Sequence, residues 1–337
     1  MRLALEGLPR MQLPSGLFCL ERRRGDPGTH GRSVRYTLMT YLGLATAAKG
    51  GREVAIDLER VETVALREVD SPEVAPGDLG LYAWVAARGS RQGEEEILER
   101  IRSALAADAL DDRDGMEIAW IVLGVAALEG PEPLVADALD KLLRNVAPSG
   151  LLYHRLLGRR RRFPNFATQI YGLLALSTAA RVGLDTRARA AATTLADRLL
   201  ALQLPDGGWP WLFDADRGTI VERYEVYSVH QHGMAPMGLL HFAETADDER
   251  YADAARRGVE WLFGRNDLQL DMVDAPEGMI YRSIRRARPF DRLALYANTA
   301  ASIAIGRAPV SGRLRLELND TCRPYELGWL LEAWAGR

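Results

Sequence analysis

From Val34 onward, segments that are apolar on every side alternate with segments that are apolar along one stripe only. Met116–Leu128 reads MEIAWIVLGVAAL and contains a single charged residue, whereas Leu134–Val146 is amphipathic. A helix that is apolar all round must be enclosed by other elements, and a striped helix lies on the outside. The alternation therefore predicts helical hairpins whose inner helices surround a common centre.

Six such hairpins of roughly 50–60 residues can be counted, within the range of period expected for stacked supersecondary repeats. The expected pairs are Val34–Ala48 with Glu53–Val69, Asp78–Arg88 with Glu94–Ala107, Met116–Leu128 with Leu134–Val146, Phe166–Ala180 with Thr186–Gln203, Pro236–Ala243 with Glu249–Arg265, and Asp291–Ile305 with Pro324–Trp334. Gly312–Leu318 alternates like a short strand, which predicts a β insertion in the last hairpin. We expect one all-α domain over residues 1–337.

Glycine followed by an aromatic residue marks the joints between hairpins. The pattern occurs at Gly16, Gly150, Gly208 and Gly278, each followed within three residues by Phe, Tyr or Trp. Six hairpins with such turns resemble the (α/α)6 toroid superfamily. That superfamily includes sugar-active hydrolases, polysaccharide lyases and epimerases, and also the barrels of squalene cyclases and prenyltransferases.

One segment, Gln203–Trp209 (QLPDGGW), is similar to the QW motif of the terpenoid members. Three departures disfavour a terpene cyclase. Asp214-Ala215-Asp216 is one acid short of the Asp-x-Asp-Asp motif of that family, the aromatic content is only 7%, and the zinc ligands of protein prenyltransferases have no counterpart. A prenyl-diphosphate-binding toroid stays open as the second interpretation.

Charge and composition limit the possible partners. The net charge of −3 gives no reason to expect nucleic-acid binding, and Cys19 and Cys322 are too few for a thiolate metal site. The N-terminal segment lacks the pattern of a signal peptide, and no run approaches about 18 apolar residues. We expect a cytoplasmic protein without a membrane span, metal or cofactor. The sequence leaves the oligomeric state open.

Long connections should gather where the inner helices begin, because every outer-to-inner connection emerges on that side. Helix N-termini offer unpaired N–H groups and partial positive charge to an anionic ligand. Three of these connections carry arginines: Arg22–Arg24, Arg159–Arg162, and Arg282 with Arg285, Arg286 and Arg288. The pattern predicts an anion-binding rim; the alternative is that the arginines pair with nearby acids.

The fourth long connection carries acids and a cluster of reactive side chains, Tyr227 to His232. His230 or Tyr227 is a candidate general base or acid, and Gln231 and His232 are candidate substrate contacts. Asp214 with Asp216, or Glu222 with Glu225, could instead serve hydrolysis as a carboxylate pair. A His-x-His metal site is the weaker interpretation, because no carboxylate at ligand spacing completes it.

Other candidate substrate-binding residues lie near the same end of the ring. Trp209 and Trp211 could stack on a sugar, while Arg35, Asn165 and Gln169 could neutralise the carboxylate of a uronic acid as negative charge develops. With the toroid resemblance, these residues predict an enzyme acting on an acidic, uronate-type saccharide. Hydrolase, lyase and C5-epimerase are not separated by the sequence, and a non-catalytic glycan-binding protein is a third possibility.

Overall fold

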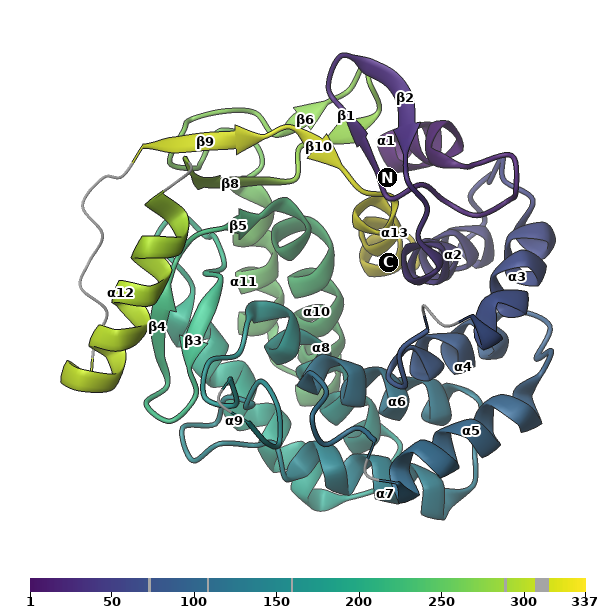
Figure 1. Cartoon of the computed structure of the whole chain (residues 1–337), viewed down its shortest axis with the longest axis horizontal. Coiled ribbons are helices and arrows are strands. Elements are labelled where there is room, and N and C mark those ends of the chain that lie inside the picture. The colour runs from purple at the N-terminus through teal and green to yellow at the C-terminus, as the bar shows by residue number, and fades with distance from the viewer. Residues whose placement is uncertain (72–73, 108, 159, 288–289, 307–314) are drawn as a thin grey trace.

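Inner helices of the repeat close into a ring in the computed structural model, which describes residues 1–71, 74–107, 109–158, 160–287, 290–306 and 315–337. Each inner helix contacts the next, and the last contacts the first (Figure 1). In ring order they are α2 (Val34–Lys49), α4 (Asp78–Arg88), α6 (Gly115–Ala127), α8 (Phe166–Arg181), α10 (Ala235–Ala246) and α13 (Pro324–Trp334). The predicted all-α toroid is confirmed.

Amphipathic helices form the outer layer and cover the ring. They are α3 (Leu58–Leu66), α5 (Glu94–Ala106), α7 (Glu132–Leu143), α9 (Thr186–Leu202) and α11 (Glu249–Glu260), and each packs on the inner helix before it in sequence. Asp57, Asp185 and Asp248 cap three of these helices with their side chains, which satisfies backbone N–H groups left free at the first turn. Short 3-10 turns, η1 (Leu8–Met11) and η2 (Arg67–Asp70), adjoin α1 (Arg2–Gly7) and α3.

The predicted sixth hairpin is wrong. Helix α12 (Phe290–Ile305) contacts strands of the connecting loops and stands outside the ring, at the lower left of Figure 1. The sixth inner helix, α13, packs instead against α1 from the N-terminal end. The sequence pattern was misleading because α12 has a helical apolar stripe, but part of that stripe is exposed to solvent: Leu293 and Tyr296 are 69% and 71% exposed.

Glycines permit the closest approaches between inner helices. A Cβ atom at Gly43 of α2 would overlap the backbone carbonyl of Gly328 in α13, and one at Gly124 of α6 would overlap that of Gly80 in α4. Since only glycine lacks a Cβ atom, these positions let two backbones meet. The first pair lies where the first and last inner helices join, so it closes the ring.

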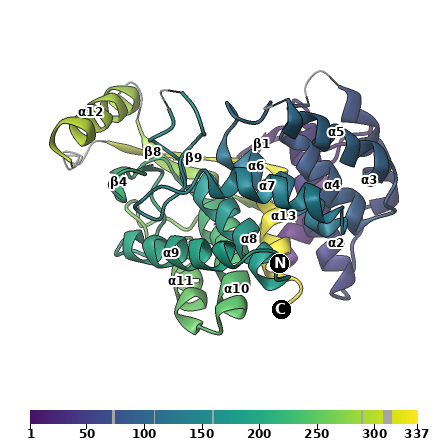
Figure 2. The ribbon, with the colours of Figure 1, turned by 90° about the horizontal axis from the view of Figure 1, so that it is seen from below.

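Short strands occur in the long connections, which lie along one side of the ring in Figure 2. They are β1 (Glu21–Arg23), β2 (Asp26–His30), β3 (Leu212–Asp214), β4 (Thr219–Glu222), β5 (Val226–Tyr227), β6 (Val273–Asp274), β7 (Met279–Ile280), β8 (Ser283–Arg286), β9 (Leu316–Asn319) and β10 (Thr321–Cys322). Four small antiparallel sheets result, in the orders β10-β1-β2, β3-β4, β5-β8-β9 and β6-β7. The expected C-terminal strand is present from Leu316; residues 312–314 of that prediction lie outside the described residues.

In the described part of the chain, no helix is long and apolar enough to cross a bilayer.

Candidate functional site

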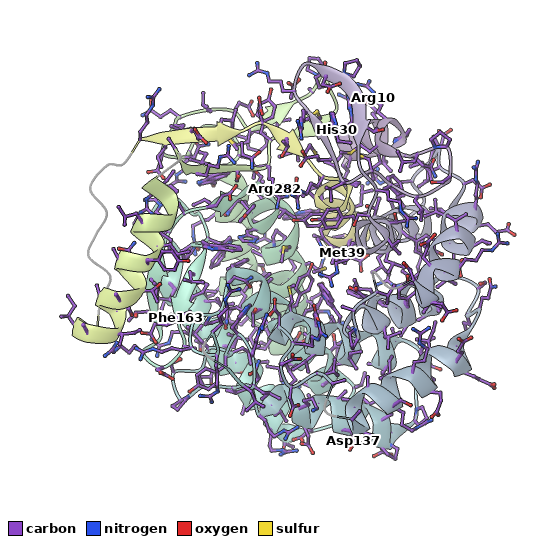
Figure 3. The ribbon with its side chains drawn as sticks, in the orientation of Figure 1. Arg10, His30, Met39, Asp137, Phe163 and Arg282 are labelled. Carbon is purple, nitrogen blue, oxygen red and sulfur yellow. The ribbon has the colours of Figure 1, made fainter. Side chains whose placement is uncertain are left out.

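The sheet β5-β8-β9 assembles the candidate site from three connections that are distant in sequence. Tyr227 of β5 pairs with Ser283 of β8, and Ser283 pairs with Asn319 of β9. Arg282 lies directly before β8, beneath this sheet and toward the middle of the ring, whereas Asp137 of α7 lies at the outer edge (Figure 3). The inner helices begin on the same side of the ring as these strands. We call this side the mouth.

An aromatic cluster surrounds His230, the first residue of the π-helical turn η3 (His230–Met234) that leads into α10. The imidazole lies 5.1 Å from the Tyr227 ring and 4.8 Å from the Phe166 ring, between centroids. The Trp211 ring is almost parallel to it, at 7° and 6.1 Å. His230 is buried, while Tyr227 and Trp211 are half-buried, so these two rings are the partly exposed side of the cluster.

Burial decides the protonation states of His230 and Tyr227. Together with the charge of Arg282, it lowers the pKa of His230 to about 3, so the imidazole is neutral at physiological pH. Burial also raises the pKa of Tyr227, so its phenol keeps its proton. The Nδ1 atom of His230 is buried and has no hydrogen-bond partner among the described residues. A proton acceptor therefore stands beside a proton donor, as acid–base chemistry requires.

Polar partners fix the Tyr227 side chain. Its hydroxyl donates to Glu225 Oε2 at 3.0 Å, and Glu225 Oε1 accepts from Asn319 at 3.2 Å. The guanidinium of Arg282 lies 4.8 Å from the centre of the Tyr227 ring and pairs with the buried Glu326 at the start of α13. The tyrosine thus has a carboxylate that can relay its proton and a cation that favours its phenolate.

Two tyrosines that the sequence reasoning missed lie next to this group. The rings of Tyr36, in the first turn of α2, and Tyr325, in the first turn of α13, are 4.5 Å apart, and both are half-buried. Arg323 donates to the Tyr36 hydroxyl, and both tyrosines lie close enough to Arg282 to raise its pKa, against the effect of burial. The available signal was their position at the start of inner helices, but pairing them required knowing that α13 closes on α2.

Arg35 lies between two acids that were also missed. Its Nε donates to Asp78 at 2.6 Å and its Nη2 to Glu117 at 3.4 Å, while its guanidinium covers the Trp120 ring. Burial raises the pKa of Glu117 in spite of the charge of Arg35. The Oε2 atom of Glu117 is buried and has no hydrogen-bond partner among the described residues. This second polar cluster has paired carboxylates with different environments, a pattern found where one acid donates a proton and the other does not.

The predicted acid pair Asp214 and Asp216 is held by a neighbouring loop. Asp214 is fully buried and accepts from both Nε and Nη2 of Arg162, at 2.8 and 2.5 Å, and from Ser302 at 2.7 Å. Although burial opposes it, the Arg162 guanidinium keeps the pKa of Asp214 low. Asp216 is exposed and accepts from the Tyr153 hydroxyl. These contacts give Asp214 a structural role that joins three segments, so we leave the pair out of the site.

Most of the predicted arginine rim is likewise paired with acids. Arg286 is buried with Glu222, and Arg285 bonds Glu317 at 2.8 Å. The same holds for Arg22 with Glu277 and Arg23 with Glu21, while Arg159 and Arg288 lie outside the described residues. Arg282 is paired as well, with Glu326, but its guanidinium also lies over the Tyr227 ring.

Four other predicted contacts brace the mouth from within. The Gln231 side chain accepts from the Trp209 backbone N–H at 3.2 Å, and the Gln169 amide bonds both backbone groups of Leu152. Trp209, Gln231 and Gln169 are fully buried. The Asn165 side chain caps α8. Their hydrogen bonds hold the connections around the His230 cluster, and of the four only Asn165 is half-buried, as Trp211 is.

His232 is directed to a different region from His230. Residues two apart on a helical turn do not share a face. His232 lines an apolar pocket between α1, α11 and α13, away from the Tyr227 cluster. Within the described residues, no group of three or more His, Cys, Asp or Glu side chains is placed to hold a metal ion.

Solved structures with the same architecture cover nearly the whole chain. Cellobiose 2-epimerase from Bacillus thermoamylovorans gives a TM-score of 0.66 at 12% identity, over 99% of this chain and 97% of the other. An unsaturated glucuronyl hydrolase specific for heparin gives 0.63 at 14% identity, over 98% and 94%. A sugar epimerase from a ruminal bacterium gives 0.62 at 12% identity, over 99% and 95%. No protein-family model and no curated protein matches the chain.

Proposed function

We propose that this (α/α)6 toroid is a carbohydrate-active enzyme that removes the C5 proton of a uronate residue in an acidic saccharide, as a lyase or a C5-epimerase. The arrangement of Tyr227, His230 and Arg282 at the mouth carries the proposal. A neutral imidazole accepts the proton, a protonated phenol donates one, and a guanidinium compensates the charge that develops on the substrate carboxylate. The sugar-active neighbours of the same fold support a saccharide as the substrate.

An acidic substrate would itself activate His230. The buried imidazole is a weak base in the empty mouth, because burial and Arg282 disfavour its charged form. A carboxylate bound about 4 Å away would favour the imidazolium by about 4 kcal/mol at an effective dielectric constant of about 20. That gain is comparable with the burial effect. A uronate would thus make His230 basic only when bound, and a neutral sugar would not.

Trp211 and Tyr227 provide the surface on which a sugar ring can lie. Their ring centres are 5.1 Å apart, and both side chains are half-buried at the mouth. Aromatic faces suit the apolar C–H face of a sugar while its hydroxyls remain in water. Glu225 holds the Tyr227 hydroxyl by accepting its hydrogen bond, and the proton that His230 takes from C5 can pass back to Tyr227, whose ring is 5.1 Å away.

Oligosaccharides containing glucuronate, galacturonate, mannuronate or iduronate provide the test. A lyase gives an unsaturated product that absorbs in the ultraviolet, and a C5-epimerase changes the ring-proton couplings in NMR spectra without cleavage. We expect one of these activities, and we expect His230→Gln and Tyr227→Phe to reduce it by about 10²–10⁴-fold, the usual contribution of a general acid or base. Full activity in either variant would contradict the assignment.

Hydrolysis is the second candidate, and the cluster of Arg35, Asp78 and Glu117 favours it. Glu117 has a raised pKa and an unpartnered buried oxygen, whereas Asp78 bonds Arg35 and accepts from the Ala75 N–H. Such a pair can supply a proton donor and a carboxylate base. Release of a reducing end without ultraviolet absorbance, lost in Glu117→Gln and kept in His230→Gln, would select this mechanism.

A further inference from the structure

An apolar pocket of about 420 Å³ lies apart from the mouth, between the N-terminal helix α1, the outer helix α11 and the last inner helix α13. Its walls include Leu3, Val259, Ile280, Leu330 and Trp334. Pockets for small molecules usually measure about 300–1,000 Å³ and combine apolar walls with a few polar groups. Both the size and the walls of this pocket fit that description.

His232 is the polar side chain in this wall. It is 2% exposed, and neither of its ring nitrogens has a hydrogen-bond partner among the described residues. The Nε1 atom of Trp334 donates to the backbone oxygen of His232, which fixes the turn but leaves the ring unengaged. A buried polar group without a partner is destabilising, so the imidazole is prepared for a hydrogen bond from a ligand. Burial lowers its pKa to about 3, so the ring is neutral and can both donate and accept.

The entrance to the pocket is apolar as well. Phe263, which follows α11, is 62% exposed and belongs to the lining. Met1, which is 38% exposed, also belongs to the lining, so two exposed apolar side chains border the cavity. Except for His232, the side chains lining the pocket are all apolar, so a ligand with a charge buried in its middle is excluded.

We propose that this pocket binds an apolar chain, alkyl or isoprenoid, whose oxygen-bearing head group forms a hydrogen bond with His232. An engineered protein cavity of about 150 Å³ holds benzene, so a volume of 420 Å³ suits a chain of about 10 to 15 carbons. This proposal does not depend on the residues at the mouth or on the proposed uronate chemistry. Free lipids and saccharides attached to a lipid both present such a chain, and they differ in the head group.

Titration calorimetry with 1-decanol, sodium decanoate and decyl glucoside, each at a concentration where it is dissolved as single molecules, tests the pocket. We expect saturable binding of one molecule per chain for at least one of the three. Decyl glucoside would indicate a lipid-linked saccharide, and decanol or decanoate a free lipid. Leu330→Trp should fill the pocket and abolish the binding, and Val259→Phe should weaken it at least tenfold.

Two further variants distinguish binding in the pocket from nonspecific hydrophobic binding elsewhere on the surface. Leu293→Trp on the exposed face of α12 is the matched control, because it adds the same ring outside the pocket, and it should leave binding unchanged. His232→Leu should weaken binding of the preferred head group by about fivefold, the usual contribution of one hydrogen bond. The proposal would be overturned if the folded wild-type protein showed no saturable binding. It would also be overturned if Leu330→Trp and Val259→Phe bound the ligand as tightly as the wild type does.

Discussion

Removing the Arg282 charge tests the physical basis of the mouth. Arg282 and Glu326 form an ion pair in which the arginine is 9% exposed and the glutamate 1%. Truncating one partner of a buried pair leaves an uncompensated charge and costs about 3–5 kcal/mol. Arg282→Met keeps most of the side-chain volume, so packing changes little. We therefore expect Arg282→Met to lower the free energy of unfolding by about 3–5 kcal/mol at neutral pH.

The double variant Arg282→Met with Glu326→Gln should recover most of that loss, because neither buried charge remains. Urea denaturation of the four proteins in this cycle gives the coupling directly. The pH dependence provides a second check. Burial already raises the pKa of Glu326, and losing Arg282 removes a neighbour that lowers it.

The sign of this pH dependence follows from proton linkage. In Arg282→Met the folded state holds the Glu326 proton to a higher pH than the unfolded state does. Stability is therefore lost as pH rises above the unfolded glutamate pKa of about 4.3, and the deficit relative to wild type shrinks in acid. A loss below about 1 kcal/mol, or a deficit that grows in acid, would refute the account of a desolvated ion pair.

Three further changes test the fold and the site. Gly43→Ala should destabilise the chain by several kcal/mol in urea denaturation, because its Cβ would meet the Gly328 carbonyl where the ring closes; an unchanged midpoint would contradict that contact. Asp214→Asn should lower thermal stability by about 3 kcal/mol through the loss of a buried carboxylate bonded to Arg162, with any saccharide turnover by the remaining folded protein retained; selective loss of turnover would return Asp214 to the site. Trp211→Ala should raise KM for a uronate saccharide about tenfold more than it lowers kcat if the ring is a binding platform, as initial-rate kinetics would show.

The inner and outer helices could be predicted from sequence because each type has its own hydrophobic pattern. The ring was predicted from the regular alternation, and contacts between successive inner helices close it (Figure 1). The last hairpin could not be predicted, because α12 carries a helical apolar stripe although, among the described residues, it contacts strands of the connecting loops and not the ring. Periodicity reports which face of a helix is apolar but not what that face contacts.

The site was predictable only where neighbours in sequence are neighbours in space. Tyr227, His230 and Trp211 lie within one connection and meet in one cluster. Tyr325 and Glu326 were missed, since their partners Tyr36 and Arg282 are far away in the chain. The arginine-rich loops predicted a cationic rim, but the sequence does not show which acidic residue each arginine pairs with.

Release of deuterium from C5-deuterated uronate oligosaccharides into water shows whether the enzyme removes the C5 proton, because lyases and C5-epimerases both break that bond. We expect release by the wild-type protein and by Leu293→Trp, and a loss of about 10²-fold or more in His230→Gln and Tyr227→Phe. Cleavage of the saccharide with the deuterium fully retained would contradict it and assign the chemistry to Asp78 and Glu117 instead.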